Sequence, residues 1–357
     1  MNEVPLTEEN TLVLDAAERI FTDLANPQTI LQSGSDDWKV PLWQALNEMG
    51  LPQAWLPESS GGYGLSLAEG FAVVRAAGRS ALAIPLVDTM AAGWIAGQAA
   101  LYLPPGAAVV IVAGSRASVQ LDGTGKLELH ATHVPFAREA QSFVVVVDDG
   151  EAARIAVVPT SDCEIVAGTN LAGDAADEVR IVSEVQTSAR VPGLSADQCL
   201  ALLATCRALQ IAGALQAALD ISVSYAKERV AFEKTISKFQ AVQQNLARLA
   251  GEVAAAVAVS ESAADALTQS DLSAAERLLE VASAKIRCAE AAEIGSRIAH
   301  QVLGAIGFTE EHILHRFTLR ALSWRDDYGN ESSWAKRLGA LVSRGTGTDL
   351  WHLLAAR

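Results

Sequence analysis

The sequence predicts a mainly α-helical protein that is interrupted by a central β domain. Residues 1–103 and 194–357 are rich in alanine and space their apolar side chains at the period of an α-helix. Residues 104–193 instead consist of short β-branched runs separated by Gly, Asp and Pro. We therefore expect an N-terminal helical domain, a β domain of sandwich or barrel type, and a C-terminal antiparallel helical bundle.

The N-terminal domain begins with a capped helix. Thr7 followed by two glutamates is typical of a helix start, and TLVLDAAERIFTDL continues with helical spacing. Residues 38–49 predict a second helix, which ends at Gly50. The segment LPQAWLPESSGGYGLS predicts a loop rich in Pro and Gly, and Ser66 is expected to cap the helix that follows it. A further apolar helix is expected over residues 87–101.

The β domain begins where the character of the sequence changes, at the Pro-Pro-Gly of residues 104–106. Six runs have strand character, and several of them alternate with a period of two: AAVVIVAG, SVQLDG, KLELHA, SFVVVV, RIAVVP and DEVRIV. Residues 144–147 are valine throughout and precede Asp-Asp-Gly, which predicts a buried strand that ends in a turn.

The C-terminal bundle is predicted from five helical segments. Their expected ranges are 196–227, 239–267, 274–303, 311–325 and 332–342. Ser195 and Ser273 stand at the N-cap positions of the first and the third segment. A glycine-bearing break at residues 304–309 separates the third segment from the fourth. Short joins between long helices favour an up-down antiparallel arrangement.

The formal net charge of −15 limits the kind of partner that the chain can bind. Nucleic acids and anionic membrane surfaces both require clustered Lys and Arg, so we expect neither as a partner. An anionic small ligand would need a local basic pocket. No window of about 18 apolar residues is evident, so no membrane-spanning segment is expected.

The cysteines and the first residues indicate the compartment. The four cysteines, Cys163, Cys199, Cys206 and Cys288, are scattered and form no CxxC pattern, which excludes the common metal and redox motifs. Cys199 and Cys206 are one heptad apart, as expected of two buried thiols on one helix face. The acidic N-terminal residues are not typical of a signal or transit peptide, and we expect a cytoplasmic protein.

Residues 225–252 have the character of a ligand site. The stretch YAKERVAFEKTISKFQAVQQNLARLAGE ends one helix, breaks at Thr-Ile-Ser, and begins another helix at Phe239. The side chains that crowd this join are Arg229, Phe232, Lys234, Phe239 and Gln240. Basic and aromatic groups together favour an anionic ligand that carries a ring. The alternative is an ordinary corner between two helices with a solvated run of charges.

Three stretches, taken in order, resemble the acyl-CoA dehydrogenase family. Leu56-Pro57-Glu58 with residues 61–66 is similar to the family's N-terminal "PE..GG.G" loop. Residues 225–241 are similar to its "Y...R..FG..I..FQA" signature, with matches at Arg229, Phe232, Ile236, Phe239 and Gln240. A "Q..GG.G[YF]" motif is matched by Gln301, Gly304, Gly307 and Phe308. The resemblance covers essentially the whole chain.

The resemblance implies the same order of domains, bound FAD, an acyl-CoA substrate, and electron-transfer flavoprotein as the acceptor. It also implies a homo- or hetero-oligomer, either a dimer or a tetramer, in which Arg229 and Phe232 contact the FAD of the neighbouring subunit. Gln240 would support the same region. The adenosine-diphosphate end of FAD would be lined by Gln301, Gly304 and Gly307. A guanidinium can bind a pyrophosphate bidentately, and glycines permit a close approach of the backbone.

The chain departs from the family pattern at two glycines. Glu233 stands where the signature has the glycine of "FG", and Ala305 replaces one glycine of the "GG" pair. An added methyl is tolerable, but Glu233 places a negative charge beside the expected pyrophosphate. If the carboxylate of Glu233 pairs with Arg229, the arginine becomes a structural ion-pair partner instead of a ligand for FAD.

The family's usual catalytic carboxylate is missing. Family members remove the α proton of the thioester with a carboxylate while a hydride passes from Cβ to the flavin. The glutamate of the usual "YEGT" motif falls on Gly329, and the positions at which other members place the base fall on Leu203 and near Gln210. The nearby acids are Asp326, Asp327 and Glu331. Asp327 and Glu331 are candidates for the base, and the alternative is that they are solvated acids at a helix boundary.

The lost motif and the sequence HRFTLRALSWRDDYG resemble bacterial acyl-CoA dehydrogenases built from unlike subunits. In such assemblies one chain carries the base and the other completes the FAD site, and this chain resembles the second kind. The other hypothesis is a non-catalytic helical scaffold that binds a partner. His312 and His315 have a spacing that can bind metal, but without a third ligand we expect a structural or surface role and no metal site.

Overall fold

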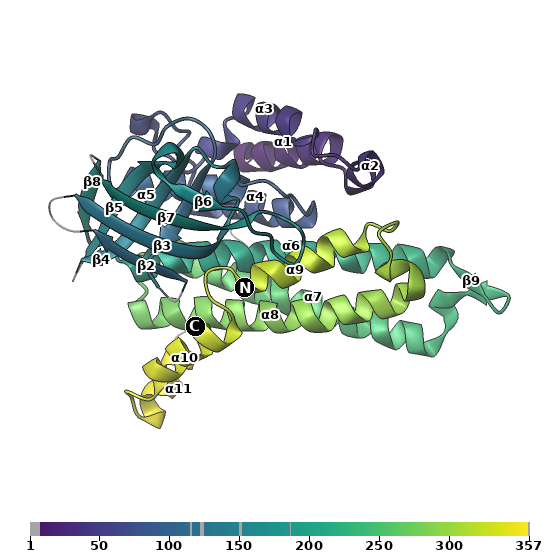
Figure 1. The fold of residues 1–357 in the computed structure, drawn as a ribbon. Coiled ribbons are helices and arrows are strands. Elements are labelled where there is room, and N and C mark those ends of the chain that lie inside the picture. Colours follow the sequence, from purple (N-terminus) through teal and green to yellow (C-terminus); the bar gives the residue numbers. More distant parts are fainter. Residues whose placement is uncertain (1–7, 115, 122–124, 150–151, 186, 356–357) are drawn as a thin grey trace. The chain divides into compact units, whose positions relative to one another are not determined.

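The structure is a computed structural model, and it describes residues 8–114, 116–121, 125–149, 152–185 and 187–355 (Figure 1). The chain packs into two compact units. The first contains residues 8–24, Asp36–Gly70 and Ala83–Leu203, and the second contains Ala25–Ser35, Phe71–Leu82 and residues 204–355. The three-domain division with boundaries near residues 103 and 193 stays a prediction.

The helices of the first unit lie close to where the sequence predicts them. They are α1 (Glu8–Leu24), α3 (Lys39–Glu48) and α5 (Leu86–Gln98), with two 3-10 turns in the predicted loop, η1 (Leu51–Gln53) and η2 (Glu58–Ser60). α4 (Leu67–Arg79), of which only residues 67–70 belong to this unit, begins after Ser66 as predicted, because the amide and the hydroxyl of Ser66 each donate to Glu69 Oε2 at 2.6 Å. Thr7, the predicted cap of the first helix, lies outside the described residues.

One short N-terminal helix was not predicted. α2 (Pro27–Ser33) is only seven residues long, which leaves too little sequence for a helical period to be visible. Its start and stop signals are nevertheless present. Asn26 accepts hydrogen bonds from the amides of Gln28 and Thr29, and Gly34 ends the helix in the left-handed conformation.

The β region consists of two four-stranded sheets. The strands are β1 (Ala108–Val112), β2 (Ala117–Leu121), β3 (Lys126–Pro135), β4 (Ser142–Asp149), β5 (Ala152–Pro159), β6 (Glu164–Val166), β7 (Ala176–Glu184) and β8 (Ser188–Pro192). Their orders are β1-β4-β5-β8 and β2-β3-β7-β6, with β1 parallel to β4 and the other pairs antiparallel. All six predicted runs form strands, whereas the short β6 and β8 were missed.

A single apolar core lies between these sheets and defines them as two packed layers. Leu127 and Val179 contribute to it from one sheet, and Phe143 and Val145 contribute from the other. β4 is buried from Phe143 to Val146, as the run of valines predicted, whereas Val147 is only partly buried. Gly150, in the predicted turn, lies outside the described residues. On the sheet that contains β1, helix α5 is fixed by Thr89, whose hydroxyl accepts a hydrogen bond from the Ala108 amide at 3.0 Å.

The second unit is dominated by the long helices α6 (Ala196–Glu228, of which residues 204–228 belong to this unit), α7 (Gln240–Thr268) and α8 (Ala274–Leu303), which run side by side (Figure 1). It also contains the shorter helices α9 (Leu314–Asp326), α10 (Glu331–Val342) and α11 (Gly347–Ala355). Both predicted serine caps are confirmed. Ser195 Oγ accepts from the Gln198 amide, and Ser273 forms a capping box with Glu276.

The connections between these helices differ most from the prediction. α9 begins at Leu314 instead of residue 311, because His312 Nδ1 accepts the Leu314 amide at 3.1 Å and ends the preceding turn. The glycine-bearing break is the 3-10 turn η6 (Gly304–Phe308). Between α6 and α7 the chain forms an unpredicted hairpin of β9 (Val230–Ala231) and β10 (Lys234–Thr235). α11 was also not predicted.

α6 contains a window that is long and apolar enough to cross a membrane by length and composition, so the expectation that the sequence has no such window was wrong. It is the only such helix found among the described residues. Of its most apolar window, 83% is buried inside the protein. This burial is typical of a core helix, and it explains why Cys199 and Cys206 are both buried as predicted.

Candidate cofactor site

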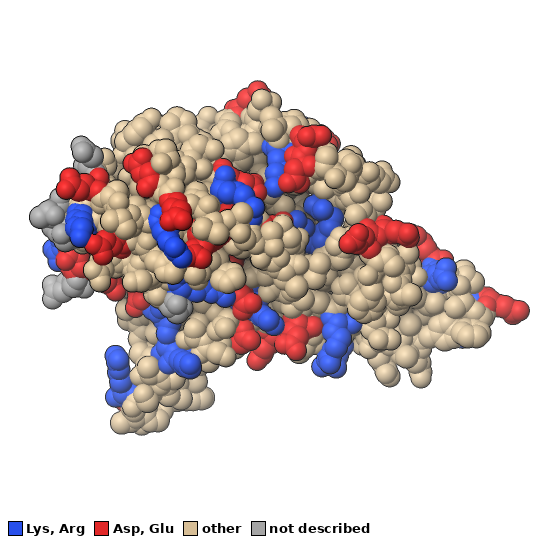
Figure 2. Space-filling view, viewed as in Figure 1, with Lys and Arg blue, Asp and Glu red and all other residues tan. Residues whose placement is uncertain are grey.

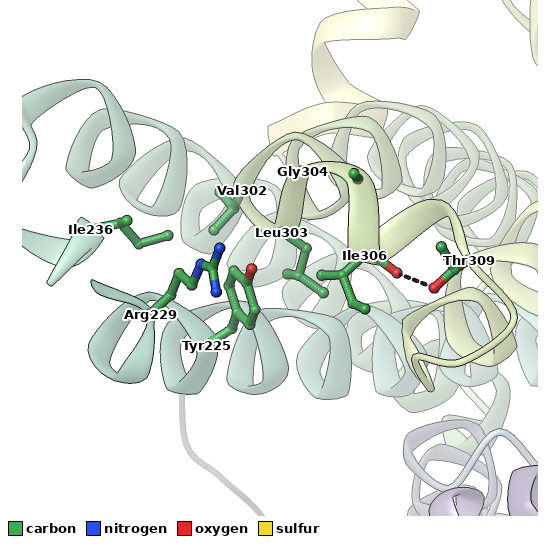
Figure 3. A pocket seen from close by; sticks show the side chains of 9 residues that line it. Tyr225, Arg229, Ile236, Val302, Leu303, Gly304, Ile306 and Thr309 are labelled. Carbon is green, nitrogen blue, oxygen red and sulfur yellow. Dashed lines mark hydrogen bonds between the residues drawn. The ribbon is translucent and has the colours of Figure 1, made fainter. Parts of the chain in front are cut away.

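A pocket of about 700 Å³ lies where the end of α6, the hairpin region and the turn η6 meet. Figure 3 shows Arg229 and Tyr225 rising together from the end of α6 toward Val302 and Leu303. The lining residues are Tyr225, Arg229, Ile236, Val302, Leu303, Gly304, Ala305, Ile306 and Thr309. The structure therefore brings together two predicted site residues, Arg229 and Gly304, that are 75 positions apart in the sequence.

Backbone hydrogen bonds fix Arg229 from both sides. Its amide donates to the Tyr225 carbonyl at 2.9 Å, which continues the helical pattern of α6 by one residue. Its carbonyl accepts the Ile236 amide at 2.8 Å, which closes the hairpin and starts the 3-10 turn η5 (Ile236–Lys238). Arg229 and Ile236 are thus held at the same mouth of the pocket, and the hairpin sets the direction in which α7 begins.

The guanidinium of Arg229 is available to a ligand. The side chain is exposed, and among the residues that the structure describes it forms no ion pair. In particular, the pairing with Glu233 that would have made it structural is not formed. An unpaired guanidinium at the mouth of a pocket provides charge-assisted donors for an anion.

Glu233 lies at the tip of the hairpin, in a backbone conformation that is unusual for a residue with a side chain. Phe232 and Glu233 are the two loop residues, and both have positive φ, 52° and 66°. This is the conformation of a two-residue turn that favours glycine, because a side chain is strained there. Glu233 therefore occupies a backbone position suited to the glycine of the family signature. Phe232 is 89% exposed and contacts the Phe239 ring edge-on at 6.3 Å between centroids.

The other predicted cofactor residues are not among those that line the pocket. Gln240 is the exposed first residue of α7, and Gln301 is exposed one turn before η6. Gly307 is buried against His300, where an added Cβ would lie 2.9 Å from Leu303 Cβ. The lining residues that prediction missed are mostly apolar ones on either side of the glycines. Tyr225 and Ile236 match the Y and the I of the family signature, so the signature could have identified them as site residues.

The histidines near the pocket have structural partners. His315 Nδ1 lies 2.7 Å from the His312 carbonyl, and His300 Nε2 lies 2.9 Å from Thr318 Oγ1. The ring of His312 meets Tyr225 edge-on at 6.3 Å between centroids. Burial lowers the pKa of His300 and of His312, which favours their neutral forms at pH 7. No group of three possible metal ligands occurs in the part of the chain that the structure describes.

The loop after α9 is fixed by a buried arginine. Arg207 on α6 is 1% exposed, and its Nε donates to Asp327 Oδ2 at 2.9 Å. Its Nη1 donates to Gln210 Oε1 at 2.6 Å, and its guanidinium carbon lies 5.3 Å from the centre of the Tyr328 ring. Asp327 is therefore not a solvated acid, and its carboxylate is held in a partly buried ion pair.

Lys285 on α8 holds the same loop through the backbone. Its ammonium donates to the carbonyls of Trp324, Arg325 and Asp327 at 3.2, 3.1 and 2.8 Å. These carbonyls end α9, where a cation complements the helix dipole. Burial lowers the pKa of Lys285 to about 8, although the nearby Asp327 charge acts in the opposite direction.

Gly329, at the usual position of the family base, has no room for a side chain. Its φ is +99°, and an added Cβ would lie 2.8 Å from both Ser333 Oγ and Trp334 Nε1. Trp334 Nε1 is held there by a hydrogen bond to the Tyr328 carbonyl at 3.1 Å. Glu331 is the first residue of α10, and its Oε2 is buried without a hydrogen-bond partner among the described residues.

The pocket fits one end of a dinucleotide. It offers an exposed cation, apolar side chains, and the backbone of Gly304 at φ +67° with open space around the position of a Cβ. These groups match a diphosphate with an attached ring system. The loop at Gly329 offers no comparable place for a catalytic carboxylate.

Comparisons with known proteins give one family. Residues 195–329 match the family model "Acyl-CoA dehydrogenase, C-terminal domain". The chain is 29% identical over 328 residues to acyl-CoA dehydrogenase FadE27 of Mycobacterium tuberculosis, covering 84% of this chain and 87% of that protein. It is 28% identical over 332 residues to acyl-CoA dehydrogenase IpdE2 of the same organism, covering 88% and 91%.

Solved structures share the fold. A Tcur3481-Tcur3483 steroid ACAD variant superimposes with a TM-score of 0.82 at 23% identity, covering 95% of this chain and 99% of that one. The ChsE4-ChsE5 complex from Mycobacterium tuberculosis gives a TM-score of 0.79 at 22% identity, covering 97% and 100%. PigA with FAD and proline gives 0.78 at 16% identity, covering 96% and 100%. The predicted fold class is therefore confirmed.

The hairpin tip predicts that Glu233→Gly stabilises the protein. Glycine relieves the left-handed strain but adds freedom to the unfolded chain, so we expect the free energy of unfolding to rise by about 0.5–1 kcal/mol. Urea denaturation would measure this difference. The control is Lys238→Gly, at an exposed position of η5 that does not have a positive φ, and it should lower stability instead. A loss of stability in both variants would contradict the strained turn.

The buried ammonium predicts a pH-dependent difference between wild type and Lys285→Met. Because the folded pKa of Lys285 lies below that of the unfolded chain, the unfolded state holds more protons between the two pKa values, and stability rises with pH there. From about pH 7.5 to about pH 9.5, the free energy of unfolding of wild type should rise by about 2 kcal/mol relative to that of Lys285→Met. Denaturation at both pH values measures this gain. Lys336 is exposed, so the difference in unfolding free energy between wild type and Lys336→Met should not change with pH. A difference for Lys285→Met that is the same at both pH values would contradict burial of a charged ammonium.

Proposed function

Because the chain belongs to the acyl-CoA dehydrogenase family of FAD-dependent oxidoreductases acting on CH–CH bonds, we propose that it completes an FAD site in a dehydrogenase assembly. The assembly would carry out the α,β-dehydrogenation of an acyl-CoA thioester. The observation that carries this proposal is the contrast between two loops. One presents an unpaired Arg229 at a pocket, and the other has no room for a carboxylate at Gly329.

In this proposal the pocket binds the pyrophosphate and adenosine end of FAD. Arg229 donates to the pyrophosphate, and the backbone at Gly304 allows close approach. Tyr225 and Ile306 provide apolar contact for the adenosine. Phe232 and Gln240, on the exposed hairpin side, would meet cofactor or protein of the neighbouring subunit, and Gln301 and Gly307 would support η6. When bound, FAD supplies the hydride-accepting flavin.

The proton-abstracting carboxylate would come from a homologous partner subunit. Asp327 is a poor candidate because its carboxylate is held by Arg207 in a partly buried ion pair, which fixes its direction. Glu331 retains one oxygen without a partner among the described residues, and it is the acid in this loop that remains to be tested. The ChsE4-ChsE5 complex, which shares this fold, contains two different components, and this supports an assembly of unlike subunits. We also propose electron-transfer flavoprotein as the acceptor and a cytoplasmic location.

Arg229→Ala should weaken nucleotide binding strongly. Loss of a charge-assisted contact to phosphate corresponds to roughly a 10- to 100-fold increase in the Kd for ADP, which probes this end of the cofactor in the chain itself. Arg229→Lys should be intermediate, because an ammonium cannot bind bidentately. Titration calorimetry with ADP measures the Kd of wild type, Arg229→Ala and Arg229→Lys. Arg248→Ala removes an exposed arginine of α7 outside the pocket and is the matched control. An equal loss of ADP affinity in Arg229→Ala and Arg248→Ala would show that ADP does not bind in this pocket.

Anaerobic titration with a panel of acyl-CoAs tests the missing base. With FAD added, the isolated chain should show no loss of flavin absorbance, and addition of a base-carrying homologue should produce that loss. Rapid bleaching by the chain alone would refute the assignment, and Asp327→Asn and Glu331→Gln would then identify the base.

A non-catalytic scaffold is the second candidate, and the lack of space at Gly329 favours it. The scaffold would bind no FAD, whereas the first candidate would bind it. A protein that remains colourless after FAD is added, both alone and with its partner, would exclude the FAD site and leave the scaffold. Yellow protein in either preparation would exclude the scaffold.

A further inference from the structure

The turn η6 forms one wall of the candidate pocket, and it begins directly after His300 and the last residues of α8. Gly304, Ala305 and Ile306 line the pocket from this turn. Thr309 closes the turn, because its Oγ1 donates to the Ile306 carbonyl at 2.9 Å (Figure 3). The carbonyl of His300 accepts the Gly304 amide, which joins the turn to α8. The position of this wall therefore depends on how the end of α8 is held.

The side chain of His300 contacts both the turn and α9. Its ring lies against the ring of Phe308, with 4.8 Å between the centroids and 33° between the planes. Its Nε2 lies 2.9 Å from Thr318 Oγ1 on α9. Its Nδ1 faces Gly307, where an added Cβ would lie 3.4 Å from that nitrogen. The imidazole thus links the turn to α9 through three separate contacts.

These contacts suit a neutral imidazole. The Thr318 hydroxyl donates to the Leu314 carbonyl at 3.3 Å, which leaves its oxygen free to accept the proton on His300 Nε2. In this tautomer Nδ1 carries the lone pair, and this atom is buried without a hydrogen-bond partner among the described residues. A proton added to Nδ1 would create a cation that is screened from water by the turn, which is costly.

The groups nearest to the ring favour the same neutral form. Burial lowers the pKa of His300 by more than the nearby backbone of Gly307 raises it. His315 on α9 and His312 in the turn before it lower this pKa further. The closed turn therefore holds the imidazole without a proton at pH 7.

No carboxylate offsets these effects. His300 forms no ion pair within the part of the chain that the structure describes, and η6 itself contains no titratable side chain. Glu310 and Glu311 follow the turn and are exposed, and from α6 Tyr225 and the cationic Arg229 line the pocket together with the turn. Figure 2 shows acidic and basic side chains interspersed over the visible face. Exposed charges farther away than about 8 Å are largely screened, so the local groups decide the ionisation of His300.

We propose that His300 is a positioning residue for nucleotide binding, whose neutral imidazole holds η6 as the pocket wall and whose protonation releases it. This role rests on the proposed FAD site, because the pocket that η6 forms is that site. A released turn exposes the imidazole to water, where its pKa is about 6.5, so the released state gains a proton as the pH falls below that value. His300 does not line the pocket. Loss of the wall therefore outweighs the attraction of its charge for phosphate, and acid weakens nucleotide binding.

The first test is titration calorimetry with ADP at pH 7.5 and pH 5.5. The ratio of the Kd at pH 5.5 to that at pH 7.5 should be about three- to tenfold larger for wild type than for His300→Gln. Protonation of ADP itself cancels in this comparison. The glutamine amide can still donate to Thr318 but does not titrate, and His300→Phe, which keeps a ring against Phe308, should behave like it. His352→Gln removes an exposed histidine of α11 and should keep the wild-type ratio.

Hydrogen exchange of the unliganded chain gives a second measurement that needs no nucleotide. After correction for the intrinsic effect of pH on exchange, the amides of residues 304–309 in wild type should lose protection by about three- to tenfold between pH 7.5 and pH 5.5. In His300→Gln and His300→Phe their protection should stay constant. Unchanged protection in the middle of α7 would show that the bundle remains folded at both pH values.

The outcomes separate this role from the cofactor site. If ADP binds with the same Kd ratio in wild type and His300→Gln, the site stands and the role of His300 is wrong. A Kd that falls at pH 5.5 in wild type relative to His300→Gln also overturns the role, because the ring would then act as a cation for phosphate. If ADP binds at neither pH, the proposed site is rejected. Hydrogen exchange then decides alone, and equal protection of residues 304–309 at both pH values in wild type would refute the release of η6.

Discussion

The buried ion pair between Arg207 and Asp327 is the constraint on which the C-terminal part of the structure depends. It joins the middle of α6 to the loop after α9, and Lys285 ties the same loop to α8 through three carbonyls. Removing charges from water is costly, so such a cluster is stable only with close geometry and satisfied partners. Once formed, it leaves the loop little freedom. The conformation of Gly329, which excludes a side chain, follows from a loop held at Asp327 and again by the Trp334 indole.

The protein uses arginine in two opposite ways within one unit. Arg207 is buried and neutralised by Asp327, with Gln210 as a further partner, and it serves the fold. Arg229 is exposed, and no carboxylate among the described residues pairs with it, although Glu233 follows it closely in the sequence. The hairpin produces this difference, because its turn carries Glu233 out into solvent and leaves the guanidinium at the pocket. Arg207 is therefore a structural residue, whereas Arg229 is available to a ligand.

Features that repeat along the sequence were predicted well. The long helices α6, α7 and α8 lie within about one residue of their predicted ends, since each has several turns of periodic apolar residues and two begin with a serine cap. The short α2, β6, β8 and the β9-β10 hairpin were missed because such short elements carry too little periodicity. In the site, the family motifs singled out Arg229 and Gly304, and both line the pocket. The motifs could not show that Gln240 and Gln301 lie outside its lining.

The sequence by itself determined the order of helical and β regions, the caps at Ser195 and Ser273, and the absence of a carboxylate at position 329. These properties depend on residue type and on spacing within a few turns. Only the tertiary structure decided that Asp327 is bound by Arg207, 120 positions away, and that Glu233 adopts a glycine-like conformation without pairing with Arg229. Both depend on how distant segments close on one another, and the energies of such contacts are set by burial and geometry that no local pattern records.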